Sequence, residues 1–244
     1  MSIIPEKEKK KIYSLLKENY LVFVPFLIFL TMLLFNSVIE KYFVDYQGLS
    51  KKIVPILFIT SIFPFILSFK YFNKKGLIEF EDIGFTRTEW KFNLFFGLLT
   101  GIFLGLLARA FVLMGVPIGA LPRGEGLYFF LGYFFMVCIS APLWEEIAFR
   151  GLLFNFFERY FNYLGKFTYL GKFTEKLDVK DFLIIVIVSS VFLMMHLDRV
   201  PAMRFLILLT SLVYTTTYYK TRNIILPIVA HSVYNLFIFL LLFN

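Results

Sequence analysis

The sequence is poor in charge, cysteine and histidine. Only 17% of its 244 residues are charged, against about a quarter in an average soluble domain. The single cysteine, Cys138, excludes a disulfide framework and a thiolate metal site within one chain. The chain also lacks a GxSxG sequence, an HExxH pair and a glycine-rich phosphate loop. These absences argue against an acyl-enzyme hydrolase, a zinc site built on a single helix, and the use of ATP.

Apolar residues are abundant instead: 59% of the chain is hydrophobic, and 34 residues are phenylalanine. They occur in continuous blocks, and a helix needs roughly 20 apolar residues to cross a bilayer core about 30 Å thick. Such blocks differ from the alternating strands of a β-barrel. We therefore predict an all-α, polytopic helical membrane protein with about seven transmembrane helices, or eight, around a polar cavity. The predicted spans are Tyr20 to Glu40, Ile53 to Tyr71, Phe92 to Val116, Leu127 to about Phe157, Phe182 to Leu197, Met203 to Tyr219 and Ile224 to Phe243.

The domain organisation and topology follow from what separates the spans. No soluble-type block intervenes, so we predict one transmembrane domain over residues 1–244, with N-terminal helices in 1–126 and a motif-bearing core in 127–240. With seven crossings, 17 Lys and Arg residues fall on the side of the N-terminus and six on the other. This bias predicts a cytoplasmic N-terminus in a multi-pass protein of the cell membrane. The span at 127–157 is long for one crossing, and Pro142 could divide it into two.

The net charge of +8 lies mainly in the loops. There it orients the chain and contacts anionic lipid head groups, so we expect membrane lipids as partners and no nucleic acid. Within the third span, Gly97, Gly101 and Gly105 recur every four residues, which predicts a face that packs closely against another helix. The tandem repeat YLGKFTYLGKFT at 163–174 falls in a basic loop, and we interpret it as a tolerated insertion.

Few strongly polar residues remain within the spans. Ionisable groups at membrane depth are rare, and they usually face a cavity or each other. Both histidines of the chain belong to this set. The members are Arg109, Glu145, Glu146, Arg150, His196, His231 and Asn235.

Helical spacing sorts these residues. Residues four apart share a helix face, so Glu146 can pair with Arg150, and His231 lies beside Asn235. Glu145 is about 100° round the helix from Glu146 and is expected to face a cavity without a partner. His196 shares a face with Phe192, four residues earlier. Arg109 either lines the cavity, pairs with a carboxylate, or extends to the head groups from near a helix end.

The same polar residues are expected at similar distances from one face of the membrane. Glu145 lies about 14 residues before the basic loop near residues 159–180, and His196 lies about 15 residues after it. At 1.5 Å per residue, both lie roughly 20 Å from one membrane face. His231 and Asn235 lie roughly 12 to 18 Å from the same face. Three helices therefore bring polar groups to one site.

A buried carboxylate and a histidine at one level can polarise a water molecule, since desolvation makes the carboxylate a stronger base. A second polar pair on another helix can donate hydrogen bonds to the oxyanion that forms when this water attacks an amide. This combination predicts an intramembrane hydrolase of peptide bonds. The alternative is a zinc site, because two histidines and one glutamate can hold zinc with an open water position.

Three motifs carry a resemblance to a known family. EEIAFRG fits the motif EExxxR, FLMMH fits FxxxH, and HSVYN fits HxxxN/D. In this order, and each at a transmembrane helix, they resemble the CPBP family of CAAX proteases and bacteriocin-processing enzymes, also called Abi. The segment LIEFEDIGFTRTEW before the third span is also similar to this family.

The resemblance implies a metal-independent intramembrane protease of the Ras-converting type, with no cofactor and with a peptide or lipidated protein as substrate. It assigns water activation to Glu145 and His196, oxyanion stabilisation to His231 and Asn235, and supporting roles to Glu146 and Arg150, with Phe192 in the second motif. A non-catalytic scaffold or bacteriocin-immunity protein that binds a partner helix is the alternative in this family. A transporter is a third possibility, but the sequence has no sign of inverted repeats or paired broken helices.

Overall fold

The computed structural model describes residues 79–118, 127–165 and 179–243, together with short pieces between residues 24 and 31 and between 66 and 74. Within this part of the chain the regular elements are all helical and no strand occurs, as predicted. The predicted spans at 20–40 and 53–71 lie outside the described residues apart from those pieces. The elements are η2 (Glu81–Ile83), α3 (Trp90–Leu113), α4 (Leu127–Phe135), η3 (Met136–Ser140), α5 (Ala141–Glu146), η4 (Ile147–Phe154), α6 (Asn155–Gly165), α8 (Val179–Met194), α9 (Pro201–Thr221) and α10 (Ile225–Phe243).

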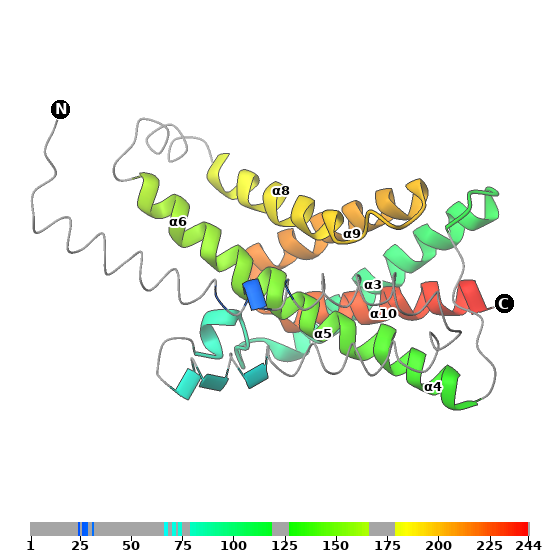
Figure 1. Ribbon diagram of the computed structural model, residues 1–244, viewed down its shortest axis with the longest axis horizontal. Coiled ribbons are helices and arrows are strands. Elements are labelled where there is room, and N and C mark those ends of the chain that lie inside the picture. Colours follow the sequence, from blue (N-terminus) through cyan, green and yellow to red (C-terminus); the bar gives the residue numbers. More distant parts are fainter. Residues whose placement is uncertain are drawn as a thin grey trace, which may run out of the picture.

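Three of the described helices are long and apolar enough to cross a membrane: Trp90–Leu113, Phe130–Asn162 and Ile225–Leu242. They correspond to the third, fourth and seventh predicted spans. The fifth and sixth predicted spans are helical too, as α8 and α9, and pack against each other. In Figure 1 the run from α4 to α6 crosses obliquely in front of α3 and α10, while α8 and α9 lie together along the upper side. The total of seven or eight crossings stays a prediction.

The run from α4 to α6 is helical from Leu127 to Gly165 without a break, so Pro142 does not divide it. The reason lies in η3, a wider π-helical turn in which the N–H of Ala141 donates to the carbonyl of Met136, five residues back. In this register the partner of the Val137 carbonyl would be Pro142, which has no N–H. The side-chain amide of Asn235 donates to this carbonyl instead, at 2.9 Å. A side chain of α10 thus supplies the hydrogen bond that Pro142 cannot.

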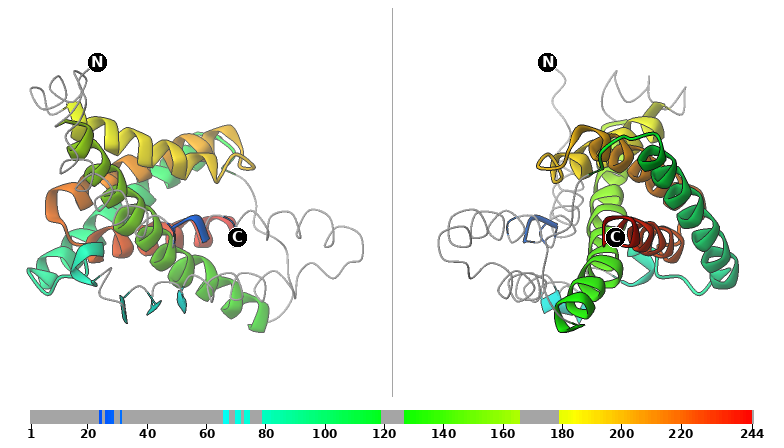
Figure 2. Two further views of the ribbon diagram at one scale, coloured as in Figure 1. Left: turned by 60° about the vertical axis from the view of Figure 1, so that its left-hand side comes forward. Right: turned by 90° about the vertical axis from the view of Figure 1, so that its right-hand side faces the viewer.

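The core of the described fold is the packing of α10 along α3, and the two helices run in the same direction. The right-hand view of Figure 2 looks nearly along α10, with α3 passing obliquely beside it. A Cβ atom added to Gly97 would lie 2.8 Å from the carbonyl oxygen of Leu226. One added to Gly101 would lie 2.6 Å from the carbonyl oxygen of Ala230 and from Cβ of Val233. Real Cβ atoms do not approach so closely, so glycine is required for this contact. The predicted close-packing face on α3 is confirmed.

The beginning of α10 is fixed by Asn223, which is 1% exposed. Its Oδ1 accepts the N–H of Ile225 at 2.9 Å, which caps the first turn of the helix. Its Nδ2 lies 3.1 to 3.2 Å from the carbonyls of Thr86 and Thr88, just ahead of α3. One amide therefore caps α10 and attaches it to the segment that leads into α3.

The ends of α6, α8 and α9 meet at the same end of the molecule. Arg222 donates to both carboxylate oxygens of Glu158, and Arg159 lies 3.2 Å from Asp82 of η2. The Tyr219 hydroxyl donates to Asp181 at the start of α8. These contacts form a charged end, defined by Asp82, Glu158, Arg159, Asp181 and Arg222.

The glycine contact yields a stability prediction. Gly101→Val forces α3 away from α10. We expect it to lower the free energy of unfolding by about 1 to 3 kcal/mol, the cost typical of overpacking. Gly132→Val in α4 is the matched control, because nothing lies within 4 Å of an added Cβ there. Thermal unfolding of the purified protein in detergent measures both. Equal unfolding temperatures for the two variants would contradict the close packing described above.

Candidate active site

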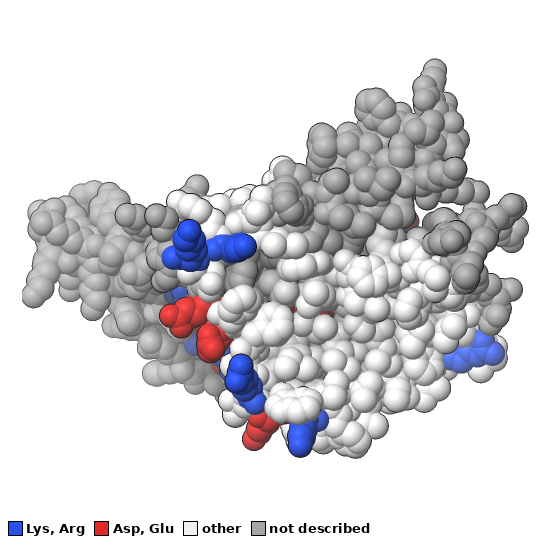
Figure 3. Space-filling view, turned by 90° about the horizontal axis from the view of Figure 1, so that it is seen from below, with Lys and Arg blue, Asp and Glu red and all other residues white. Residues whose placement is uncertain are grey.

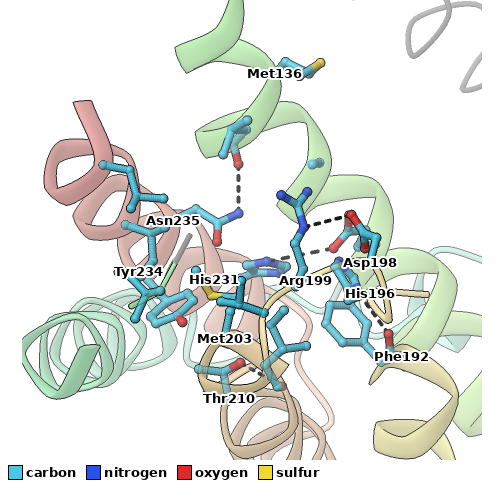
Figure 4. A pocket seen from close by; sticks show the side chains of 18 of the residues that line it. Met136, Phe192, His196, Asp198, Arg199, Met203, Thr210, His231, Tyr234 and Asn235 are labelled. Carbon is cyan, nitrogen blue, oxygen red and sulfur yellow. Dashed lines mark hydrogen bonds and ion pairs between the residues drawn. The ribbon is translucent and has the colours of Figure 1, made fainter. Parts of the chain in front are cut away.

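A cavity of about 420 Å³ lies between α4, η3, α5, the α8–α9 turn, α9 and α10. The four residues predicted as the centre of the site all line it: Glu145, His196, His231 and Asn235. They come from α5, from the turn after α8, and from α10. Figure 4 shows His196, His231 and Asn235 around the common space, with the apolar side chain of Met203 below them. The structure thus brings together residues that are 90 positions apart between Glu145 and Asn235.

The ion pair predicted between Glu146 and Arg150 is present and completely buried. Nη1 of Arg150 lies 3.1 Å from Oε1 of Glu146, and both side chains are 0% exposed. Nη2 of Arg150 donates to the hydroxyl of Ser211 at 2.7 Å and to its backbone carbonyl at 3.2 Å. A charge removed from solvent persists only when it is paired and hydrogen-bonded in this way.

Aromatic rings complete the surroundings of Arg150. Its guanidinium lies 4.7 Å from the ring centre of Phe192 and 5.7 Å from that of Tyr214. Such ring faces attract cations, most strongly where water is excluded. Sequence reasoning did not select Ser211 or Tyr214. Their signal is weak, since hydroxyl side chains are common in apolar helices and only the fold reveals that they face Arg150.

His231 lies between the two glutamates. Its Nδ1 is 2.8 Å from Oε1 of Glu146, and its Nε2 is 3.9 Å from Oε2 of Glu145. The ring stacks on Tyr214, with 5.3 Å between ring centres. Helical spacing predicted that Glu145 points away from Glu146 and lacks a partner. This is wrong in part: the two carboxylates diverge, but they meet opposite edges of one imidazole that α10 inserts between them.

Glu145 differs from Glu146 in its access to the cavity. Its side chain is 16% exposed and lines the cavity, whereas that of Glu146 is fully enclosed. Glu146 already has Arg150 and His231 as close partners. Glu145 is therefore the carboxylate that a molecule in the cavity can contact.

The tautomer of His196 follows from its hydrogen bond. Nδ1 lies 2.9 Å from the backbone carbonyl of Phe192, and a carbonyl can only accept, so Nδ1 carries the proton. In the neutral ring, Nε2 is left with the lone pair. The ring also packs on Phe192, at 4.8 Å between centres. Phe192 thus orients His196 through both its backbone and its side chain.

Asn235 is partly occupied by the structural hydrogen bond to Val137. A side-chain amide has two N–H donors and one carbonyl oxygen, so one donor and the oxygen remain available beside the cavity. Arg109 does not line the cavity; it is exposed near the end of α3, which agrees with the expectation of a side chain near a helix end.

Metal-ligating side chains do not gather in threes among the described residues: no group of His, Cys, Asp and Glu has a metal-binding arrangement there. Glu145 and His231 approach each other, with 3.9 Å between the nearest nitrogen and oxygen.

The apolar wall of the cavity comes mainly from α9 and α10, and its open edge is polar. Met203, Ile207 and Ile238 line it, while Asp198 and Arg199 in the α8–α9 turn stand at its exposed edge. Nε of Arg199 lies 3.4 Å from Oδ2 of Asp198. The cavity is therefore lined by apolar side chains as well as by the polar residues, and its lining residues in the α8–α9 turn are exposed.

Comparison with known proteins gives one family match. Residues 127–237 match the family model described as "Type II CAAX prenyl endopeptidase Rce1-like". This range contains all three motifs and every residue of the polar centre. No curated protein and no solved structure matches the chain.

The buried ion pair generates a prediction on stability. Arg150→Met removes one partner of an enclosed carboxylate, and breaking such a pair lowers the free energy of unfolding by about 3 to 5 kcal/mol. Arg159→Met removes the exposed pair with Asp82 and is expected to lower it by about 1 kcal/mol or less. Thermal unfolding of both variants in the same detergent distinguishes them. Similar unfolding temperatures would show that Arg150 does not stabilise the fold in this way.

Proposed function

We propose that the chain is an intramembrane endopeptidase of the CAAX protease family that acts through Glu145, His196, His231 and Asn235, because residues 127–237 match the model of that family. Its substrate would be a membrane-associated peptide, prenylated or unprenylated. One observation carries the proposal: the residues of three motifs, distant in sequence, line a single cavity that an exposed rim connects to the outside. A cavity of about 420 Å³ is large enough for several side chains of an extended peptide.

Water activation is assigned to Glu145 and His196. Glu145 is the carboxylate that lines the cavity and is partly exposed there, so a water molecule in the cavity can give it a proton. The lone pair on Nε2 of His196 provides a second acceptor for the same water. With both hydrogens held, the oxygen of the water is oriented toward a peptide carbonyl that enters the cavity.

The proposed reaction has two steps. The water oxygen bonds to the carbonyl carbon while its proton passes to Glu145, and the carbonyl oxygen becomes an oxyanion. The C–N bond then breaks, and the protonated Glu145 returns the proton to the leaving nitrogen. The products are a carboxylic acid and an amine, which become a carboxylate and an ammonium group when the acid gives its proton to the amine. Glu145 is again a carboxylate, and no acyl intermediate forms.

Oxyanion stabilisation is assigned to His231 and Asn235. The free N–H of Asn235 can donate directly, since its other N–H is held by Val137. His231 donates through Nε2 only when the ring carries two protons, because Nδ1 is directed at Glu146. Glu146 is accordingly a positioning residue: it orients the imidazole and balances its charge, and Arg150 holds Glu146 in place.

The proposal is metal-independent. The zinc alternative would use Glu145, His196 and His231 as ligands, with water in the fourth position, although these three side chains do not stand in a metal-binding arrangement among the described residues. The two versions share the same residues and differ in their response to a chelator, so the activity assay below includes one.

Activity measurements test the proposal. We expect the purified full chain to cleave at least one member of a panel of prenylated and unprenylated peptides. Glu145→Gln removes the base while it preserves the shape of the side chain, so we expect kcat to fall by about 10² to 10⁴-fold. His196→Ala should have a loss of similar order. Glu79→Gln, the same chemical change at an exposed residue outside the cavity, is the matched control.

Several outcomes discriminate between the alternatives. Full activity of Glu145→Gln, or no cleavage of any peptide by the wild type, would contradict the protease and favour a binding role. Loss of activity with a chelator and recovery with zinc would favour the zinc version. Unchanged activity with a chelator supports the Glu/His version.

A further inference from the structure

The ring plane of His231 is not fixed by the side chain itself. The last torsion of a histidine is broad and roughly two-fold, so the groups around the ring decide how it turns. Nδ1 lies 2.8 Å from Oε1 of Glu146, but a single hydrogen bond tolerates a range of angles and lets the ring rock about this contact. Nε2, which lies 3.9 Å from Oε2 of Glu145, is the atom that the proposed oxyanion contact requires. Its direction therefore depends on what lies against the face of the ring.

Tyr214 of α9 covers one face of this ring. The ring centres of Tyr214 and His231 are 5.3 Å apart and the ring planes differ by 26°, which is an offset-stacked arrangement. Phe192 also meets the imidazole, at 6.0 Å between centres, but with 72° between the planes. A stacked neighbour opposes rotation of the imidazole out of its plane, because the edge of a turning ring would collide with it. Tyr214 is therefore placed to limit the motion of Nε2.

Tyr214 is itself held firmly by the fold. It is 1% exposed, and its hydroxyl donates to the carbonyl of Ala230 at 3.5 Å, which is a long and weak hydrogen bond. The guanidinium of Arg150 lies 5.7 Å from the centre of its ring. Glu146 binds Arg150 and His231 at their nitrogen atoms, and Tyr214 offers its ring to the same two groups. The ring, rather than the hydroxyl, therefore makes the contacts that concern the site.

The stacked contact also suits a charged imidazole. In the proposed mechanism His231 carries two protons when it donates through Nε2, and the face of a tyrosine ring attracts positive charge, most strongly where water is excluded. The side chain of His231 is 8% exposed. On the face shown in Figure 3, the charged side chains gather mainly along one edge and leave a broad uncharged surface, as expected for a protein enclosed by lipid. Solvent therefore weakens the contact little.

We propose that Tyr214 is a positioning residue of the active site, whose ring keeps the imidazole of His231 turned so that Nε2 faces Glu145 and the cavity. This inference rests on the proposed protease function and adds a residue that belongs to none of the three motifs. Tyr214 is not among the residues that line the cavity. It therefore acts on the reaction through His231 and not by contact with the substrate.

Tyr218 provides the matched control for a ring that only fills space. It lies one turn later on α9 and is also 1% exposed. Its ring meets that of Phe154, with 5.4 Å between centres, and its hydroxyl accepts a hydrogen bond from Asn155 at 3.0 Å. These partners belong to η4 and α6 and not to the polar centre. Loss of either tyrosine ring thus removes buried aromatic surface, but only the loss of Tyr214 uncovers His231.

Four forms of the full chain are compared in detergent: the wild type, Tyr214→Phe, Tyr214→Met and Tyr218→Met. Methionine is unbranched and flexible, so it fills much of the vacated space without a ring. kcat and KM are measured with the peptide of the panel above that the wild type cleaves best. The chain has only two histidines, so ring labelling with ¹⁵N gives the signals of two imidazoles, which a His196→Gln variant assigns. Thermal unfolding shows that each variant is folded.

We expect Tyr214→Met to lower kcat by about 10 to 10²-fold, the cost of a small misplacement within a site, while KM changes by about twofold or less. Tyr214→Phe should recover most of this loss, because it keeps the ring. Tyr218→Met should unfold at a lower temperature than the wild type but keep kcat within about twofold. The imidazole signals of His231 should move in Tyr214→Met and stay in place in Tyr218→Met. A nuclear Overhauser contact should join the rings of Tyr214 and His231 in the wild type.

Equal values of kcat in Tyr214→Met and Tyr218→Met overturn the inference, and so does an equal loss in Tyr214→Phe and Tyr214→Met. The contact between the two rings is read from the wild type. Its absence therefore overturns the inference, and its presence supports it, even where Tyr214→Met does not fold. If the wild type cleaves no peptide, the protease proposal fails, and the imidazole signals still decide whether Tyr214 orients His231.

Discussion

One buried carboxylate organises the centre of this molecule. Glu146 is shared by Arg150 on its own helix and by His231 of α10. Without solvent, neither the glutamate nor the arginine is tolerable alone, so the helices that carry them and the hydroxyl of Ser211 must come together. The position of His231 in the cavity depends on this arrangement.

A second constraint connects α10 to the long α4–α6 helix. The π-helical turn at Met136–Ser140 and the missing N–H of Pro142 leave the Val137 carbonyl to Asn235. π-helical turns of this kind often occur at functional sites, because they alter the direction of side chains without ending the helix. Here the turn precedes Glu145 by one helical turn, so the same distortion that requires Asn235 also sets the direction of the carboxylate. Structural and chemical roles of Asn235 are therefore compatible, since its two N–H groups are separate donors.

The sequence predicted the helical class, the close-packing glycines of α3 and the pair of Glu146 with Arg150, because each depends on spacing along a single helix. It also named Glu145, His196, His231 and Asn235, which line one cavity. It did not predict that His231 lies between the two glutamates, because that position depends on how α10 packs against α5. The sequence also did not predict that the helix continues through Pro142. This continuity involves the side-chain amide of Asn235, 93 residues later in the chain, which donates the hydrogen bond that Pro142 cannot. Roles of Ser211 and Tyr214 depend on contacts between helices and leave no periodic pattern.

The glycine contact between α3 and α10 makes the two helices one mechanical unit. The opposite face of α3 is covered with exposed phenylalanine and leucine side chains, such as Phe95, Leu99 and Phe103, which in a bilayer meet the acyl chains. His231 and Asn235 belong to the same unit, whereas Glu145 and His196 do not. The hydrogen bonds of His231 to Glu146 and of Asn235 to Val137 connect this unit to the helix that carries Glu145. The lipid-facing surface of α3 is therefore joined to the polar centre through α10 by packing and by two hydrogen bonds.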